Sequence, residues 1–103
     1  MNIKKHYTVK DLEKEFGPLT FGRALESFRL CEELTLKDFA KKLKITAQSL
    51  CDIEKGRRIP SVSRAAEIAI KLREPLETWV QLALNDLLRE ADLKFEIEIK
   101  RVS

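Results

Sequence analysis

The spacing of apolar residues predicts five short helices between residues 20 and 91. Phe21, Ala24, Leu25 and Phe28 recur at intervals of three and four residues, so a helix from Phe21 to about Glu33 would have one apolar face. The same kind of spacing recurs in four further segments, Leu36–Leu43, Ala47–Lys55, Pro60 to about Leu72 and Pro75 to about Ala91. The chain is therefore expected to be mainly α.

Threonines stand directly before three of the predicted helices. Thr20, Thr35 and Thr46 each precede a periodic run, where a hydroxyl oxygen can accept a hydrogen bond from a free N–H of the first turn. Thr8 can cap a further helix in the same way, and a Gly-Pro pair would end it. We therefore expect an extra N-terminal helix over residues 8–17.

The last segment, LKFEIEIKRV, changes to a period of two. Apolar and charged side chains alternate over residues 93–102, which predicts a half-buried β-strand. Nothing else in the chain reads clearly as its partner, and a lone strand leaves its backbone groups unpaired. We therefore expect it to pair with the same strand of a second subunit, or with another protein. The expected dimer interface combines strand and last-helix residues: Val80, Leu84, Leu87, Leu88, Phe95, Ile97 and Ile99.

The composition is that of one helical domain over residues 1–103. Charged residues make up 36% and apolar residues 44%, with only three glycines and three prolines. No apolar run is long enough to cross a membrane, and the first residues lack the features of a signal peptide, so a cytoplasmic protein is expected. Cys31 and Cys51 are then expected to be free thiols.

The candidate chemistry does not favour an enzyme. His6 is the only histidine, and no Ser/His/Asp or Cys/His set can be assembled around it. The cysteines at 31 and 51 form no CxxC pair, so a zinc site is not expected either. We expect neither catalytic residues, nor a metal, nor a cofactor.

The net charge of +3 is unevenly distributed along the chain. Residues 1–34 carry six cations and six anions, residues 35–64 eight and three, and residues 65–103 six and eight. The sums are 0, +5 and −2, so the excess positive charge lies in the middle segment. A localised basic surface suggests a polyanion as partner, whereas a scattered set of solvated charges is the alternative.

Two of the helices predicted in this basic segment are separated by only three residues. Helices joined so tightly cannot lie antiparallel, so they cross steeply, as in a helix-turn-helix. Ala40 is the small residue expected at the crossing. Ile45, Leu50 and Ile53 are expected to hold the second helix from behind. Its outward face would then fit the DNA major groove, with base-reading residues Ala47, Gln48, Cys51 and Asp52.

Cations follow the second of these helices. Lys55, Arg57 and Arg58 stand around a glycine that is a natural left-handed helix terminator. We expect these cations, together with Thr35 and Thr46, to contact DNA phosphates. The arrangement favours a DNA-binding protein in which the turn presents a reading helix and the arginines anchor it.

The residue pattern at this point resembles a known family. The motif L-T-x-x-x-F-A-x-x-L-x-I-T-x-x-x-L-x-x-I-E-x-G, followed by Pro60 and an apolar helix, is similar to the XRE (Cro/phage-repressor) family of helix-turn-helix proteins. The resemblance covers about residues 21–82. It implies a five-helix, lambda-repressor-like core within residues 20–91 and a homodimer that binds double-stranded DNA at a near-palindromic operator.

Individual residues match the family pattern. Arg29 matches the arginine that forms an ion pair with the glutamate at Glu54, and the resemblance implies this structural pair here. Ala47, Gln48 and Asp52 match the family's base-reading positions.

Two positions depart from the pattern. Leu36 stands where many members have a glutamine that contacts phosphate, so that anchor is expected to be missing. Lys44 stands where the turn usually has glycine, so the turn is expected to be strained or slightly different in shape.

A narrower resemblance leaves the biological role open. The runs FGRALESFRL, CDIEKGRR and VQLALNDLLREADL are similar to HigA-type antitoxins, which implies a RelE/HigB-like toxin as a further partner. Three functions are compatible with the chain: a DNA-binding repressor, an antitoxin that also represses, and a helical protein-interaction adaptor that binds no DNA. Only the first two account for the basic segment.

Overall fold

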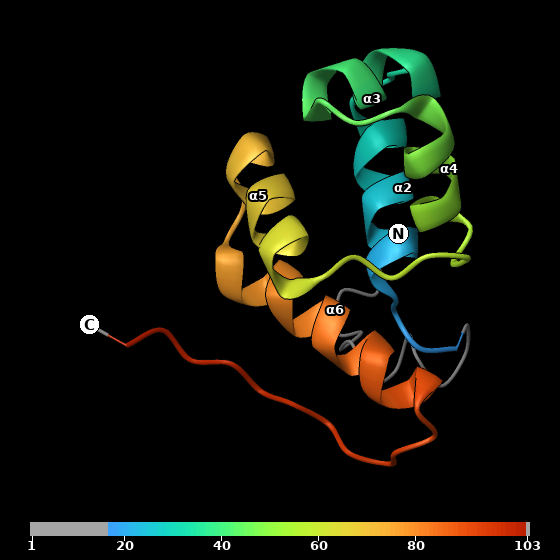
Figure 1. Cartoon of the computed structure of the whole chain (residues 1–103). Coiled ribbons are helices and arrows are strands. Elements are labelled where there is room, and N and C mark those ends of the chain that lie inside the picture. The colour runs from blue at the N-terminus through green and yellow to red at the C-terminus, as the bar shows by residue number, and fades with distance from the viewer. Residues whose placement is uncertain (1–16, 103) are drawn as a thin grey trace, which may run out of the picture.

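Five helices follow one another in the part of the chain that the computed structural model describes, residues 17–102. They are α2 (Phe21–Cys31), α3 (Leu36–Leu43), α4 (Ala47–Glu54), α5 (Val62–Leu72) and α6 (Leu76–Glu90) (Figure 1). The apolar spacing therefore located all five, and only some terminal residues differ. The extra helix predicted after Thr8 lies outside the described residues.

Side-chain hydroxyls begin four of the helices. The hydroxyl oxygens of Thr20, Thr35 and Thr46 accept hydrogen bonds from the backbone N–H three residues on, at 3.1, 3.1 and 3.0 Å. Ser61 does the same for α5 at 3.2 Å. Pro75 precedes α6 without a side-chain cap. The local sequence thus sets where most of the helices start.

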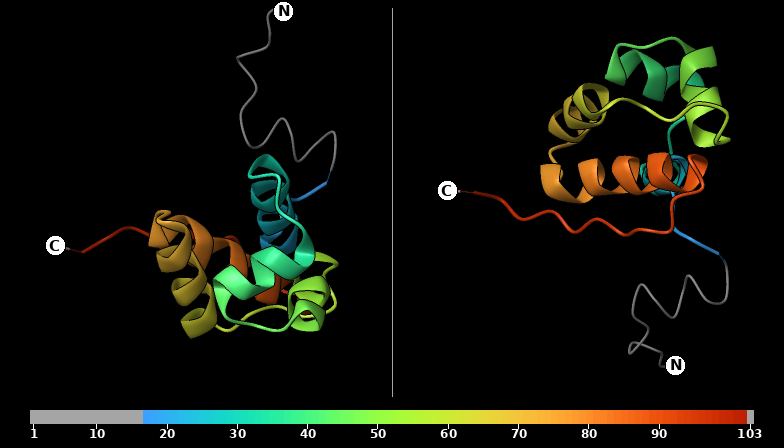
Figure 2. Two further views of the ribbon diagram at one scale, coloured as in Figure 1. Left: turned by 90° about the horizontal axis from the view of Figure 1, so that it is seen from above. Right: turned by 60° about the horizontal axis from the view of Figure 1, so that its bottom comes forward.

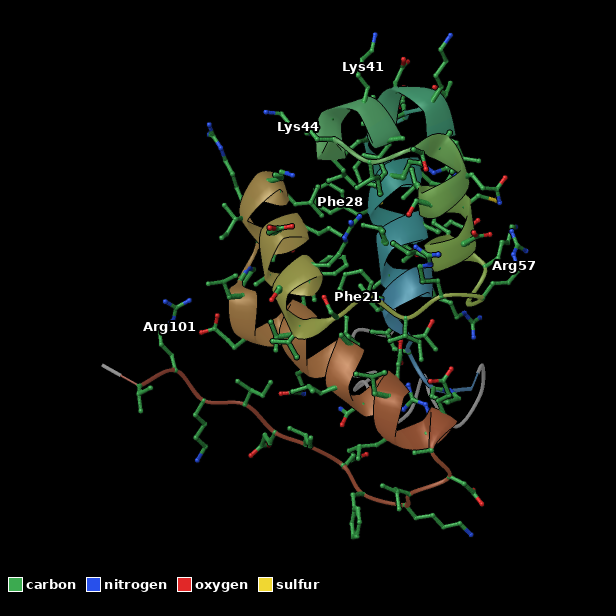
Figure 3. All side chains as sticks on the ribbon, in the orientation of Figure 1. Phe21, Phe28, Lys41, Lys44, Arg57 and Arg101 are labelled. Atoms are coloured by element: carbon green, nitrogen blue, oxygen red, sulfur yellow. The ribbon has the colours of Figure 1, made fainter. Side chains whose placement is uncertain are left out.

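One apolar core lies between the helices. Its largest fully buried side chains are Phe21, Leu25, Phe39, Leu43, Leu50, Ile53 and Ile68. Two aromatic pairs join different helices: Phe21 meets Trp79 edge-on at 5.3 Å, and Phe28 stacks on Phe39 at 6.2 Å. Phe21 and Phe28, labelled in Figure 3, both belong to α2. The core therefore fixes α2 against both α3 and α6.

A glycine lets α2 and α4 touch. A Cβ atom built on Gly22 would lie 2.1 Å from the carbonyl oxygen of Ile53 and 3.0 Å from that of Glu54. Atoms cannot approach so closely, so any other residue at this position would push the two helices apart. Gly22 thus sets how α4 lies on α2.

A buried carboxylate joins α6 to the start of α2. The backbone N–H of Phe21 donates to Asp86 Oδ2 at 2.9 Å, and Arg89 forms an ion pair with the other carboxylate oxygen. Burial raises the pKa of the Asp86 carboxyl, although both of these contacts oppose that shift. Asp86 therefore satisfies one of the free N–H groups at the N-terminus of α2 from a distant helix.

The C-terminal residues 93–102 run extended beside α6 but form no strand, and the described part of the chain contains no strand at all (Figures 1 and 2). The strand prediction was therefore wrong. Side chains of α6 take the place of a partner strand. Asn85 accepts from the N–H of Ile97 at 2.7 Å and donates to its carbonyl at 3.3 Å, while Gln81 accepts from the N–H of Ile99 at 2.9 Å.

The match between tail and helix has a geometric reason. Arg101 forms two hydrogen bonds with Glu77, at 3.0 and 3.1 Å, so residues 77, 81 and 85 meet residues 101, 99 and 97. Four helical residues rise by about 6 Å. Two extended residues advance by about 6.6 Å. The spacing of the α6 side chains therefore matches the spacing of the tail residues over three contacts. The alternating segment thus packs along a helix rather than in a sheet.

Candidate nucleic-acid interface

The turn between α3 and α4 keeps a left-handed residue although glycine is absent. Lys44 has φ 61° and ψ 42°, and the N–H groups of Lys44 and Ile45 donate to the carbonyls of Lys41 and Ala40, at 3.2 and 3.0 Å. Ala40 is buried, as expected at the crossing. The turn therefore has the shape that glycine would favour, and Lys44 carries a strain of about 1–2 kcal/mol.

The two sides of α4 differ sharply in exposure. Leu50, Ile53 and Glu54 are buried, whereas Ala47 and Gln48 are exposed. Cys51 and Asp52 are half-buried on the same outward side. The structure thus places all four predicted base-reading residues on one accessible helix face, where they can approach a ligand in the solvent.

The polar groups of this face form a network around Asp52. The Oδ1 atom of Asp52 accepts from Gln48 Nε2 at 3.0 Å and from Arg57 Nε at 2.9 Å. Arg57 Nη2 also approaches Cys51 Sγ at 3.5 Å. The hydrogen bond from Arg57 is the main cause that lowers the pKa of the Asp52 carboxyl. We call Gln48, Asp52 and Arg57 the Asp52 network.

Exposed cations and hydroxyls lie near the outward face of α4. Lys55, Arg57 and Arg58 are exposed, and the N–H groups of both arginines donate to the carbonyl of Asp52, which ties their loop to the end of α4. Thr35 and Thr46 are exposed as well. Their hydroxyl oxygens accept the capping bonds, so each O–H still can donate to a phosphate. Thr46, Lys55, Arg57 and Arg58 therefore lie at the two ends of α4, whereas Thr35 lies at the start of α3.

Further lysines extend the basic surface. Lys41 and Lys44 project outward from the α3 end of the molecule, and Arg57 lies beside the loop after α4 (Figure 3). Lys37 and Lys42 are also exposed. Seven of the eight cations counted along residues 35–64 thus lie on or next to α3 and α4, and the eighth, Arg64, lies on α5.

An ion pair holds α4 to α2. Arg29 Nε and Nη2 donate to the two carboxylate oxygens of Glu54, at 2.9 and 3.1 Å. The side chains are 12% and 2% exposed. The third guanidinium nitrogen of Arg29 donates to the carbonyl of Leu34 at 3.0 Å. The structure therefore brings together the two residues expected to pair, and it adds a bond to the loop before α3.

The residues predicted for a dimer interface differ in exposure. Val80, Leu84, Leu88, Ile97 and Ile99 are half-buried within the single chain, and Val80 and Ile99 line the same groove. The other two are exposed: 36% for Leu87 and 69% for Phe95.

Four residues that hold the helices and the tail in place were missed by the sequence analysis: Gly22, Gln81, Asn85 and Asp86. Gly22 interrupts an otherwise ordinary helix, and Asp86 lies within an apolar run, so both are visible as unexpected residue types. Gln81 and Asn85 are four residues apart on α6, which puts two amides on one helix face. The sequence does not show which residue each of these four contacts, because each partner is distant in sequence.

Other kinds of site have no support in the described residues. No helix within residues 17–102 is long and apolar enough to cross a membrane. The same range holds no group of three or more His, Cys, Asp or Glu side chains placed to bind a metal ion.

Comparisons with known proteins agree with this geometry. A family model described as helix-turn-helix (HTH_3) matches residues 26–79, which are 54 of the 103 residues and include α3, the turn and α4. No curated protein and no solved structure matched the chain. HTH_3 is the XRE-type family of DNA-binding helix-turn-helix domains. Because its model covers more than half of the chain, the protein belongs to the XRE-type helix-turn-helix family.

Proposed function

We propose that the protein is a sequence-specific regulator that binds double-stranded DNA and represses transcription. The observation that carries this proposal is the outward face of α4, where Gln48 and its neighbours are accessible and surrounded by exposed cations. A face of this size fits the major groove, and cations at its border can neutralise phosphates.

The residues of the interface divide into two roles. Gln48 has an amide that can make two hydrogen bonds to adenine, which supplies sequence preference. Arg57 and Arg58 stand beside the helix rather than on its reading face, so they supply affinity through phosphates. Thr46 at the start of α4 and Lys55 at its end add two further phosphate contacts in this arrangement.

We further propose that the protein acts as a homodimer on a palindromic operator. Leu87 on α6 and Leu93 and Phe95 on the tail expose 36%, 46% and 69% of their surface. A second copy that covers these side chains would place two reading helices on one face of the DNA. In such dimers the half-sites are about 34–36 Å apart, one helical turn.

An antitoxin role is the second candidate. Leu30 and Ile70 are 58% and 63% exposed and lie on α2 and α5, outside both the reading face and the proposed dimer surface. In this role, Leu30 and Ile70 would contribute separately to contact with a RelE/HigB-like toxin. Co-purification with the product of a neighbouring gene would support this role. If no such protein co-purifies, the antitoxin role is refuted and the repressor role remains.

DNA binding is tested by selecting duplexes from a random pool and measuring affinity for the selected site at several salt concentrations. We expect a log–log salt slope of about −0.9 for each neutralised phosphate. Gln48→Ala should cost about 1–3 kcal/mol at one base pair and leave the slope unchanged. Arg57→Ala and Arg58→Ala should weaken all sequences alike and flatten the slope.

Lys100→Ala is the matched control, because it removes an exposed cation from the tail rather than from the interface. If the unmodified protein binds no duplex in a salt-dependent way, the DNA-binding proposal is wrong and an adaptor becomes the better description.

A further inference from the structure

Within the proposed interface, one carboxylate holds two groups that are expected to touch DNA. Asp52 Oδ1 accepts hydrogen bonds from both Gln48 and Arg57. We propose that Asp52 sets specificity by holding Gln48 in its reading orientation and restraining Arg57, so that DNA of the wrong sequence is bound weakly. This inference rests on the proposed DNA-binding function, and it gives Asp52 a role beyond contact with a base.

The first part of the argument concerns the orientation of Gln48. To read adenine, the amide must accept from N6 with its oxygen and donate to N7 with its nitrogen. One N–H of Gln48 Nε2 is directed to Asp52, which leaves the second N–H and the oxygen free. Turning the amide over would put its oxygen against a carboxylate. The bond to Asp52 therefore favours one of the two amide orientations.

The second part concerns the charge of Arg57. Its side chain is 57% exposed while that of Asp52 is 23% exposed, so the arginine can swing away but the carboxylate stays on the reading face. When Arg57 turns to a phosphate, Asp52 loses its cation and faces an anionic duplex. That repulsion is relieved only where a base offers a donor, such as cytosine N4. Sequences without the donor are therefore penalised.

Two substitutions separate orientation from charge. Asp52→Asn keeps an oxygen that can accept from Gln48 but removes the negative charge. Asp52→Ala removes both. Neither variant removes a side chain of the apolar core, and the backbone hydrogen bonds from Arg57 and Arg58 to the carbonyl of residue 52 remain. Glu98→Gln is the matched control, since it removes one exposed carboxylate from the tail.

The measurements are affinities of each variant for the selected duplex and for an unrelated duplex, at several salt concentrations. Asp52→Asn should bind the unrelated duplex about threefold or more tightly and gain less affinity for the selected duplex, because no carboxylate then repels the phosphates where a donor base is missing. Its preference at the base pair read by Gln48 should be unchanged. Asp52→Ala should also lose that preference, as far as Gln48→Ala does. Glu98→Gln should change neither.

The possible failures are distinct. If the unmodified protein selects a sequence but Asp52→Asn leaves the ratio of specific to unrelated affinity unchanged, the proposed role of charge is wrong. If Asp52→Ala keeps the preference at that base pair, the proposed orientation of Gln48 is wrong. If the unmodified protein binds no duplex, the proposed function fails first and the inference falls with it.

Discussion

At the scale of single residues, Arg29 and Glu54 show why a charged pair can lie beside an apolar core. Glu54 follows Ile53 on α4, and its carboxylate is almost fully buried against α2. Both of its oxygens are bonded by Arg29, and this hydrogen bonding raises the pKa of the arginine. The pair is therefore needed because the site is buried, since neither charge could remain there alone.

We predict that removing either partner destabilises the fold by about 3–5 kcal/mol, because a buried charge is left without its counter-ion. Arg29→Ala should cost slightly more than Glu54→Ala, because it also frees the carbonyl of Leu34. Urea unfolding of both single variants and of the double variant measures the coupling. Strictly additive costs would contradict a direct interaction.

Lys44 is a second residue whose backbone matters more than its side chain. Lys44→Gly should raise the free energy of unfolding by about 0.5–1 kcal/mol, because glycine adopts the left-handed conformation without strain although it loses more entropy on folding. The matched control is Lys42→Gly, which places glycine inside α3 and should lower stability by about 1 kcal/mol. Thermal unfolding distinguishes the two. A loss of stability in both variants would refute the argument.

At the scale of elements, α6 and the tail depend on each other. The helix supplies Glu77, Gln81 and Asn85 at every fourth position, and the tail supplies a bonding group at every second. The α6 side chains form these hydrogen bonds only with the tail, and the tail forms them only with α6. The tail therefore follows α6 because two different repeats happen to have nearly equal length.

This dependence predicts a response to acid. Arg101 lowers the pKa of the Glu77 carboxyl from an ordinary value of 4.5 to about 2. A carboxyl with a depressed pKa stabilises the docked tail above pH 4.5, and that contribution is lost as the pH falls toward 2. Protection of the Ile99 amide from hydrogen exchange should decline across this window.

The comparison with Glu77→Gln isolates this effect from other carboxyls that titrate in the same range. The variant should show weaker protection at neutral pH and little further change on acidification. Glu90→Gln, at an exposed position of the same helix, should behave like the unmodified protein. Equal pH profiles for Glu77→Gln and the unmodified protein would rule out the ion pair as the cause.

At the scale of the whole molecule, the basic segment and the proposed dimer residues lie in different places. The exposed lysines and arginines of residues 35–64 lie around α3 and α4, whereas Leu87, Leu93 and Phe95 lie on α6 and the tail (Figure 1). Such a separation lets one region bind DNA while another binds a protein. It is the reason for placing the proposed dimer contact away from the reading helix.

We predict that Leu87→Glu and Phe95→Glu shift the protein from dimer to monomer and weaken operator binding, because each puts a charge into the proposed contact. Ile70→Glu is the matched control, since Ile70 is 63% exposed but lies on α5. Sedimentation over a range of concentrations reports the assembly. A monomeric unmodified protein, or equal disruption by Ile70→Glu, would refute this dimer.

Local interactions explain which parts of the protein could be predicted. The threonine caps and the apolar spacing act within a few residues, so the five helices and the exposed side of α4 follow from the chain itself. The motif around Ala40 and Gly56 likewise indicates a helix-turn-helix from the sequence alone. The caps and the helical spacing depend on neighbours no more than four residues away, whereas the motif is a pattern spread over residues 34–56.

Tertiary structure decided the remaining features. Alternation over residues 93–102 shows only that one side of an extended segment is apolar, and it does not distinguish a neighbouring strand from a helix that offers amides at matching intervals. Gly22 and Asp86 likewise acquire their roles from atoms 31 and 65 residues away, at Ile53 and Phe21. Sequence by itself thus determined the helices and the exposed face of α4. The contacts between distant residues were decided by the packed fold, because a local pattern does not identify a partner far away in the sequence.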